Sequence, residues 1–213
     1  ALRALVIASS GNEAFCAGGD LQQMGDGAPD AFDAHGERGQ FAALFRDLWD
    51  LGKPVLARVQ GPAMAGGFGL AAACDLIIAS EKASFGLPEV AVGIWPYMIT
   101  VPLLHAMAPR QALRLMMTGE RIDAVEGQRL GFVTEVTPHA ELDACIDRWI
   151  ARLSAGSPQA IALGRTAFYT ALNHDMDARL RMLEALLTAN LTMPDAAEGL
   201  AAFAEKRRPN WKT

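Results

Sequence analysis

The sequence predicts an α/β core followed by a helical region. Three observations support this. β-rich runs alternate with helical segments up to Pro109, two of these runs lead into the small-residue loops CAGGD and GPAMAGG, and successive amphipathic helices follow Pro109. Alternation of strands and helices is typical of an α/β core, and apolar stripes on helices must be buried. We therefore expect a core over residues 1–135 and a helical region over residues 136–213.

The core elements follow from hydrophobic periodicity and from helix-ending residues. An apolar face at helical spacing indicates a helix before Gly52 and Pro54, which end it. β-rich apolar runs on either side of that helix indicate buried strands. The expected elements are, in order, a strand at 2–8, a helix at 32–51, a strand at 54–60, a helix at 66–74 and a strand at 76–79.

The second half reads as a series of amphipathic helices. Asp123 is a good N-cap residue for one of them, because its carboxylate can accept a hydrogen bond from a free backbone amide of the first turn. The expected elements are helices at 110–118 and 123–130, a strand at 132–136, and helical segments at 140–155, 157–191 and 195–207.

Composition narrows the class of protein. The chain has 213 residues, of which 51% are hydrophobic, enough for one sizeable core. A net charge of -5 gives no general attraction to phosphate backbones, so nucleic acid is not an expected partner. No run reaches the roughly 18 apolar residues of a transmembrane helix, so no membrane partner is expected. The three cysteines have neither CxxC nor Cys/His metal spacing, which indicates a reducing, cytoplasmic location and no metal.

The first candidate for chemistry is AFCAGGDL at residues 14–21. Gly18 and Gly19 carry no Cβ, so the backbone can approach a ligand closely and direct its amides at it. The alternative is a tight turn between a strand and a helix, because paired glycines often mark turns only.

The second candidate is GPAMAGGFGLAAACD at residues 61–75. Gly66 and Gly67 lie where a loop enters an Ala-rich helix, and free amides at a helix start favour developing negative charge. The string GFGLAA, with Glu89 about 20 residues on, also matches a Rossmann dinucleotide fingerprint. Five residues, 61–65, separate the glycines from the strand, however, whereas a Rossmann glycine follows its strand directly.

The third candidate is ASFGLPEVAVG at residues 83–93. Glu89 lies among Leu87, Pro88, Val90 and Val92, and an apolar setting raises the pKa of a carboxyl group and makes it a better base. The alternative is an ordinary carboxylate at a helix start beside a proline.

Together these segments, with LMMTGERIDAVEGQRLGFVTEV and the terminal FAEKRRPNW, resemble the crotonase (enoyl-CoA hydratase/isomerase) superfamily over the whole chain. The resemblance implies a spiral of ββα units with a C-terminal α-helical trimerisation region, a homotrimer or dimer of trimers, and a coenzyme A thioester as substrate without a separate cofactor. It places the oxyanion-hole amides at Gly19 and Gly66, and the second of the two hydratase carboxylates at Glu89. It implies substrate contacts at Ala17, Gly18, Asp20, Leu21, Ala65 and Gly67.

Three departures from the family pattern bear on the reaction. Gly69 stands where hydratases carry their first glutamate, and Gln22 where many relatives place a CoA-contacting lysine. The family's opening strand-strand-helix would precede Ala1, so we expect the N-terminal part of the fold to be missing. Because one base can move a proton between two carbons, whereas hydration is usually served by two carboxylates, Gly69 favours an isomerase over a hydratase.

Two other functions remain open at this point. One is a dinucleotide-binding oxidoreductase, and the other is a non-catalytic relative that binds acyl-CoA or a protein. Trp95, Tyr97 and Met98 follow Glu89 where relatives often have small residues, which predicts a reshaped acyl pocket.

Overall fold

The computed structural model describes residues 2–19, 31–172 and 176–211. Its internal contacts divide the chain into two compact units. Unit 1 comprises Ala1–Leu5, Trp49–Pro54 and Asp147–Thr213, and unit 2 comprises Val6–Leu48 and Val55–Ile146. All three candidate motifs belong to unit 2. The boundary expected at residue 135 stays a prediction.

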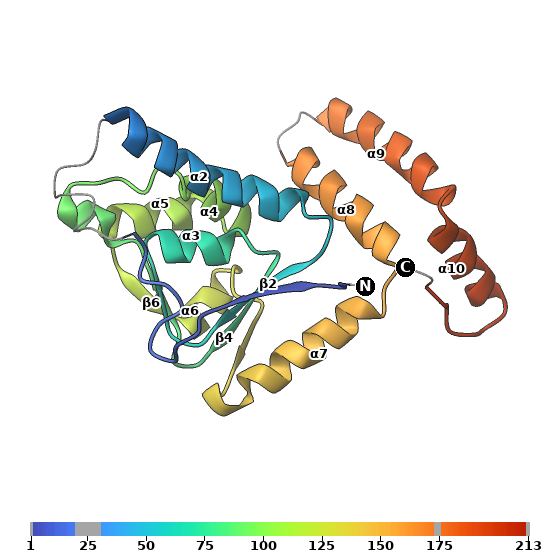
Figure 1. The fold of residues 1–213 in the computed structure, drawn as a ribbon, viewed down its shortest axis with the longest axis horizontal. Coiled ribbons are helices and arrows are strands. Elements are labelled where there is room, and N and C mark those ends of the chain that lie inside the picture. Colours follow the sequence, from blue (N-terminus) through green and yellow to red (C-terminus); the bar gives the residue numbers. More distant parts are fainter. Residues whose placement is uncertain (1, 20–30, 173–175, 212–213) are drawn as a thin grey trace. The chain divides into compact units, whose positions relative to one another are not determined.

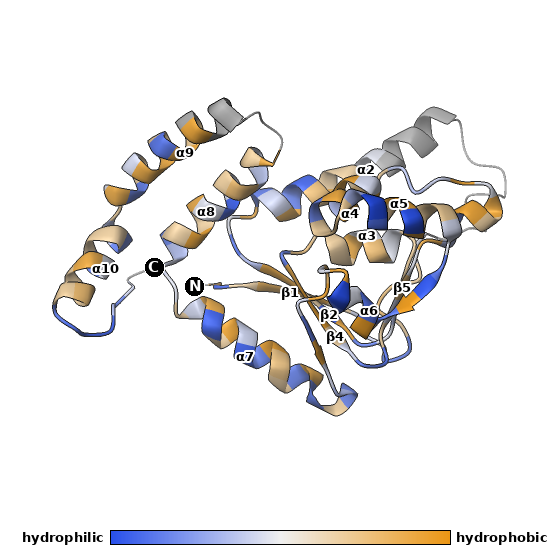
Figure 2. Cartoon of the chain, turned by 180° about the vertical axis from the view of Figure 1, so that it is seen from behind, coloured by the Kyte–Doolittle hydropathy of each residue, from blue (hydrophilic) through white to orange (hydrophobic). Residues whose placement is uncertain are grey.

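The larger sheet of unit 2 is built around two buried strands. The sheet has the order β1-β2-β4-β7, and β2, β4 and β7 run parallel. Val55, Leu56, Ala57 and Val59 have no exposed surface, so β2 is apolar on both faces except at Arg58. Figure 2 colours β2 and β4 largely as hydrophobic. The strands are β1 (Leu5–Ala8), β2 (Val55–Val59), β4 (Leu76–Ser80) and β7 (Glu135–Thr137).

The second sheet is smaller and carries the candidate site. It has the order β3-β5-β6, in which β3 and β5 run parallel and β6 antiparallel to β5. The strands are β3 (Pro62–Met64), β5 (Ser84–Gly86) and β6 (Arg121–Asp123). The chain therefore passes through β2, β3 and α3, then through β4, β5 and the helices after them (Figure 1). This succession of a strand in each sheet followed by a helix confirms the expected spiral of ββα units.

The helices largely agree with their expected positions. They are α2 (Ala31–Asp50), α3 (Gly66–Ala72), η1 (Pro88–Val92), α4 (Thr100–Ala106), α5 (Pro109–Thr118), α6 (Ala124–Arg129), η2 (His139–Glu141), α7 (Leu142–Ser154), α8 (Pro158–Ala171), α9 (Met176–Leu191) and α10 (Pro194–Ala204). Asp123 is the N-cap of α6, as expected, because its Oδ1 accepts a hydrogen bond from the Glu126 amide at 2.8 Å.

One predicted strand lies elsewhere. Residues 132–136 were expected to form it, but only its last two residues belong to β7. The amides of Phe132 and Val133 both donate to the Gly127 carbonyl at 3.2 Å, so these residues close the end of α6 as a turn. Their apolar side chains are buried, and consecutive buried apolar residues are also typical of a strand.

An aromatic cluster lies between α3 and the smaller sheet. Phe68 of α3, Phe85 of β5 and Phe132 are buried, and their ring centroids lie 5.0 to 5.1 Å apart. Tilted and edge-to-face pairs of this kind each contribute about 0.5–1.5 kcal/mol beyond the area they bury. The cluster therefore holds α3 firmly against the smaller sheet.

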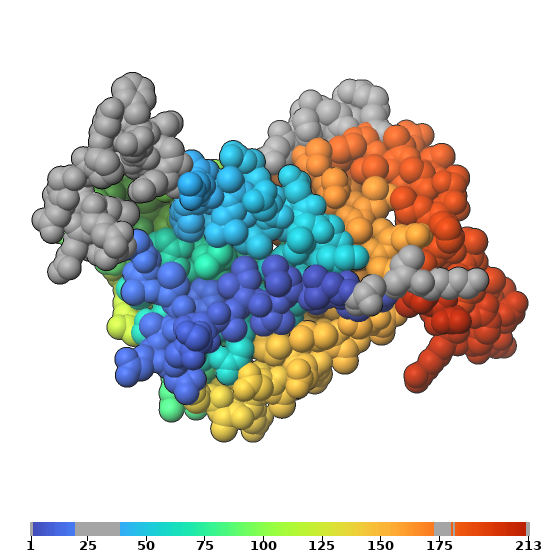
Figure 3. Space-filling view, viewed as in Figure 1, coloured from blue at the N-terminus to red at the C-terminus, as the bar shows by residue number. Residues whose placement is uncertain are grey.

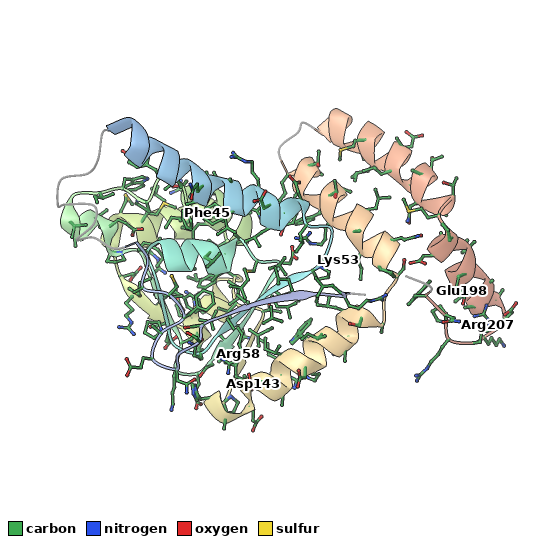
Figure 4. The ribbon with its side chains drawn as sticks, viewed as in Figure 1. Phe45, Lys53, Arg58, Asp143, Glu198 and Arg207 are labelled. Carbon is green, nitrogen blue, oxygen red and sulfur yellow. The ribbon has the colours of Figure 1, made fainter. Side chains whose placement is uncertain are left out.

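Polar contacts complete each unit. In unit 2, Arg58 Nε lies 2.6 Å from Asp143 Oδ1 (Figure 4), and this hydrogen bond lowers the pKa of the Asp143 carboxyl. In unit 1, the Arg3 guanidinium donates to the carbonyls of Ser154 and Gly156 at 2.9 and 2.8 Å. Asp143 is largely exposed, so its ion pair adds little to stability.

Helices α3 and α4 meet at a glycine that has no room for a side chain. A Cβ built on Gly69 would lie 2.1 Å from Ile99 Cγ2 and 2.5 Å from Ile99 Cβ. Ile99 itself is only 3% exposed. The side chain of Ile99 therefore occupies the volume that any side chain at position 69 would need.

We predict that Gly69 and Ile99 are thermodynamically coupled. Gly69→Ala should destabilise the protein, because overpacking a filled core costs about 1–3 kcal/mol, and Ile99→Ala should cost about 2–5 kcal/mol. In the double variant the two changes compensate, so its loss should fall short of the sum by about 1–3 kcal/mol in denaturant unfolding. Gly164→Ala is the matched control, since no atom lies within 4 Å of its Cβ position and helix propensity alone predicts a gain. Additive losses at positions 69 and 99 would contradict the packing.

Candidate functional site

The structure brings the three sequence motifs to one edge of the smaller sheet. Cys16 forms a parallel bridge with Ala63 of β3, and Met64 of β3 is in parallel register with Gly86 of β5. Gly18, Gly66 and Glu89 each follow one of these three parallel segments within a few residues. Because parallel segments end at the same edge, the three motifs emerge there together.

The first loop is anchored by a buried glutamine. Gln60, at the end of β2, is 1% exposed, and its Nε2 donates to the carbonyls of Gly11 and Ala14 at 2.7 Å. Gly61 lies so close to the same loop that a Cβ on it would approach the Glu13 carbonyl oxygen to 2.7 Å. These contacts fix the chain that leads to Gly18. The segment 6–19 (dark blue) lies at the surface beside α2 (cyan) in Figure 3.

Gly18 and Gly66 lie next to each other. Gly18 has φ 97°, a left-handed conformation that favours glycine. A Cβ on it would lie 2.8 Å from Ala65 Cβ and 3.3 Å from the Gly66 nitrogen. The residues on either side of Gly18, Ala17 and Gly19, are both exposed. The two glycine loops therefore meet at Gly18 and Gly66, and the oxyanion role of the Gly19 and Gly66 amides stays a prediction.

Ala65 holds a strained turn that presents the Gly66 amide. Its φ of 51° and ψ of -126° are rare for a residue with a Cβ and cost on the order of 1–3 kcal/mol. The Ala65 amide donates to the Gly86 carbonyl at 2.9 Å, so it serves the fold and is not free for a ligand. The Gly66 amide, at the first position of α3, donates to no acceptor among the described residues. Strain here thus accompanies an unused donor at a helix start.

Gly67 has a steric role. A Cβ on it would lie 2.2 Å from the Cys16 carbonyl oxygen and 2.7 Å from Cys16 Cβ. Gly66 differs, because a Cβ on it would make only an ordinary contact, 3.5 Å from Cζ of the Phe41 ring in α2. Gly67 therefore allows the loops to approach each other, whereas Gly66 has an unused amide and lies beside the Phe41 ring.

Glu89 has the environment of a base. It is the second residue of η1, which begins directly after the fully buried Leu87. Its Oε2 is buried without a hydrogen-bond partner among the described residues. Burial raises the pKa of Glu89, and a hydrogen bond to its own backbone lowers it by less. The raised pKa agrees with expectation, although Val92 is 55% exposed and contributes little to the apolar setting. A buried carboxylate oxygen without a partner lowers stability. Groups of this kind are typically retained where they serve a function.

The position at which hydratases carry their first glutamate is apolar in this chain. Gly69 is three residues after Gly66 on α3, so both lie on one face of the helix. The space beside Gly69 is filled by the Ile99 side chain. Of the residues expected to reshape the acyl pocket, Tyr97 is 75% exposed and Met98 37% exposed. Trp95 is half-buried. Ile99 of the same segment lies against the Gly69 position, a contact that no sequence pattern indicates.

Some expectations fall outside the described residues. Asp20, Leu21 and Gln22 lie outside the described ranges, so their expected roles stay predictions. Among the residues that the structure describes, no group of three or more His, Cys, Asp or Glu side chains is placed to hold a metal ion. None of the helices in the described ranges has the length and apolar character needed to cross a membrane.

A separate hollow in unit 1 offers little for chemistry. It measures about 300 Å³ and is lined by Pro194, Asp195, Ala197, Glu198, Ala201 and Asn210. Both acidic residues are engaged, since Asp195 accepts a hydrogen bond from the Ser157 hydroxyl at 2.6 Å and Glu198 pairs with Arg207 at 2.6 Å. Figure 4 labels this Glu198–Arg207 pair. The candidate site therefore remains the sheet edge in unit 2.

Sequence reasoning missed three residues that shape this edge. They are Gln60, Phe41 and Ile99. Phe41 lies on the apolar face predicted for the helix at 32–51, so its position was foreseen but its contact with Gly66 was not. For Gln60, a polar residue directly after a largely apolar strand is a usable signal. Ile99 gave none, because its contact with Gly69 is formed only in the folded chain.

Comparison with known proteins gives a consistent result. The family model described as enoyl-CoA hydratase/isomerase matches residues 1–213. The mouse enoyl-CoA hydratase domain-containing protein 3, mitochondrial, is 34% identical over 211 residues, covering 99% of this chain and 69% of the relative. A carnitinyl-CoA dehydratase of Proteus mirabilis is 37% identical over 218 residues, covering 99% of this chain and 82% of the relative.

Solved structures agree with these relatives. The enoyl-CoA hydratase of Mycobacterium smegmatis superposes with a TM-score of 0.93 at 33% identity, covering 99% of this chain and 81% of that one. Human enoyl-CoA hydratase domain-containing protein 3 superposes with a TM-score of 0.90 at 32% identity, covering 99% and 82%. The chain thus belongs to the enoyl-CoA hydratase/isomerase family and has the crotonase fold.

Proposed function

We propose that this protein is an acyl-CoA enzyme that stabilises a thioester enolate with the amides of Gly19 and Gly66 and moves a proton with Glu89 as its only acid/base. The observation that carries the proposal is the shared sheet edge, where an unused Gly66 amide and the buried Oε2 of Glu89 follow strands in register. We propose isomerisation of an enoyl-CoA double bond as the favoured reaction.

The chemistry follows from these two groups. An α-proton of a thioester is weakly acidic, and its removal places negative charge on the carbonyl oxygen. Backbone amides fixed by the fold stabilise this charge without reorganisation, and each such donor contributes about 10²–10³ in rate. Glu89, with its raised pKa, accepts the proton at carbon 2 and returns it at carbon 4, which shifts the double bond.

The preference for isomerisation rests on Gly69 and Ile99. Hydration needs a water molecule held and deprotonated beside carbon 3, and an apolar side chain there supplies no hydrogen bond for it. The relatives compared above are named for hydratase and dehydratase reactions, which makes hydration the second candidate.

The dinucleotide alternative loses its structural basis. The string GFGLAA lies wholly within α3. A Rossmann phosphate loop instead requires its glycines at the turn between a strand and a helix.

Assembly and location are also proposals. In unit 1, large apolar side chains are exposed on α8, α9 and α10, among them Phe168 at 60% and Phe203 at 86%. Exposed apolar side chains on this scale favour association, and we propose a homotrimer or dimer of trimers in the cytoplasm.

Glu89→Gln should abolish most of the turnover. It keeps the size of the side chain but removes the base, so conversion of a 3-enoyl-CoA to the 2-enoyl-CoA should slow by about 10²–10⁴. Binding of a saturated acyl-CoA should persist, because the amides remain. Rates are followed by absorbance at the enoyl thioester band. Rapid hydration of crotonyl-CoA by the unmodified protein, undiminished by Glu89→Gln, would show that another group activates water.

The same substitution should stabilise the fold at neutral pH. Because the folded-state pKa of Glu89 is raised above the ordinary value of 4.5, the folded protein loses stability as pH rises from that value through the raised pKa. Glutamine carries no such penalty. We therefore expect Glu89→Gln to have the higher Tm at about pH 8 and nearly the wild-type Tm at about pH 4. A Tm difference that does not change with pH would contradict the environment assigned to Glu89.

Gly66→Pro tests the oxyanion donor. Proline is tolerated at the first position of a helix and removes the amide hydrogen, so turnover should fall by about 10²–10³. Gly66→Ala is the matched control, because its methyl group fits against Phe41 and the amide remains. Circular dichroism checks the fold of both variants. Equal activity of well-folded proline and alanine variants would remove Gly66 from the mechanism.

A further inference from the structure

Ile99 fills the space beside Gly69 from the start of α4. It directly precedes α4 in a helical conformation (φ -76°, ψ -9°), and its carbonyl accepts a hydrogen bond from the Leu103 amide at 3.1 Å. Its side chain is buried and occupies the volume that any side chain at position 69 would need.

The position of this side chain relative to Gly66 follows from helix geometry. Side chains three residues apart on a helix have Cβ atoms about 5–6 Å from each other, and each leans toward the helix N-terminus. Ile99 Cγ2 lies 2.1 Å from the Cβ position of residue 69. Its methyl group therefore stands on the face of α3 to which Gly66 belongs, about one turn further along.

We infer that Ile99 determines substrate specificity by selecting acyl-CoA thioesters without a hydroxyl group on carbon 3. The inference rests on the proposed function, because the Gly66 amide must hold the thioester oxygen. With that oxygen at Gly66, the next acyl carbons pass along the same face of α3 and reach the Ile99 methyl group. The preferred ligands are saturated acyl and enoyl thioesters, and 3-hydroxyacyl thioesters are disfavoured.

The magnitude follows from desolvation. A hydroxyl group placed against a methyl group loses its hydrogen bonds to water and gains none. An apolar pocket typically rejects an added hydroxyl group by about 10² at most. We therefore expect a preference of about 10- to 100-fold in affinity for the thioester without the hydroxyl group.

Calorimetric titration with butanoyl-CoA and 3-hydroxybutanoyl-CoA tests this inference. All titrations use a Glu89→Gln background, which prevents turnover. The protein with Ile99 should favour butanoyl-CoA by about 10- to 100-fold. Ile99→Val keeps the β-methyl groups and should keep the preference. Ile99→Thr has the shape of valine but offers a hydroxyl group, so it should reduce the preference by about 3- to 10-fold, the effect of one hydrogen bond.

The outcomes distinguish failure of this inference from failure of the proposed acyl-CoA function. Equal affinity of the Ile99 protein for both thioesters, or an unchanged preference in Ile99→Thr, overturns the inference and leaves the acyl-CoA function standing. Failure of both thioesters to bind the Ile99 protein overturns the acyl-CoA function itself. Ile99→Ser serves as the second polar variant should Ile99→Thr not fold, with the same reduction expected.

Discussion

Contact between two stretches of main chain is the constraint on which the site depends. The Met64 amide donates to the Cys16 carbonyl at 2.9 Å, and Gly67 packs on the same carbonyl so closely that a Cβ would lie 2.2 Å from its oxygen. This approach places Gly18 beside the Gly66 amide. The described residues at this contact, Cys16, Gly18, Met64 and Gly67, carry no charge. The proposed oxyanion donors thus depend on backbone geometry, which a single side chain at position 67 would disrupt.

Stability is given up at this edge in two places. Ala65 has a positive φ that glycine would adopt without strain, and Glu89 keeps a buried oxygen without a partner among the described residues. Each feature is unfavourable for folding, and each lies where the proposed chemistry needs it. The surrounding Phe68, Phe85 and Phe132 cluster supplies compensating packing. Such local costs beside a rigid core are typical of functional sites.

The long elements and the three motifs could be predicted from the sequence, because apolar periodicity and paired glycines are local signals. β3, β5 and β6 could not, since a strand of three residues is too short to show alternation. Yet the register of β3 with β5 is what brings Gly66 and Glu89 to one edge. Ile99 was missed for a related reason. The sequence shows that Gly69 lacks a carboxylate, but only the fold shows what fills its place.

The central claim is that one buried carboxylate and backbone amides suffice to form a thioester enolate. Exchange of the α-protons of butanoyl-CoA in deuterated water isolates this step, because a saturated chain has no double bond to hydrate or shift. Nuclear magnetic resonance follows the loss of the carbon 2 signal. We predict that the unmodified protein catalyses this exchange and that Glu89→Gln slows it by about 10²–10⁴. Bound butanoyl-CoA without any catalysed exchange would contradict it.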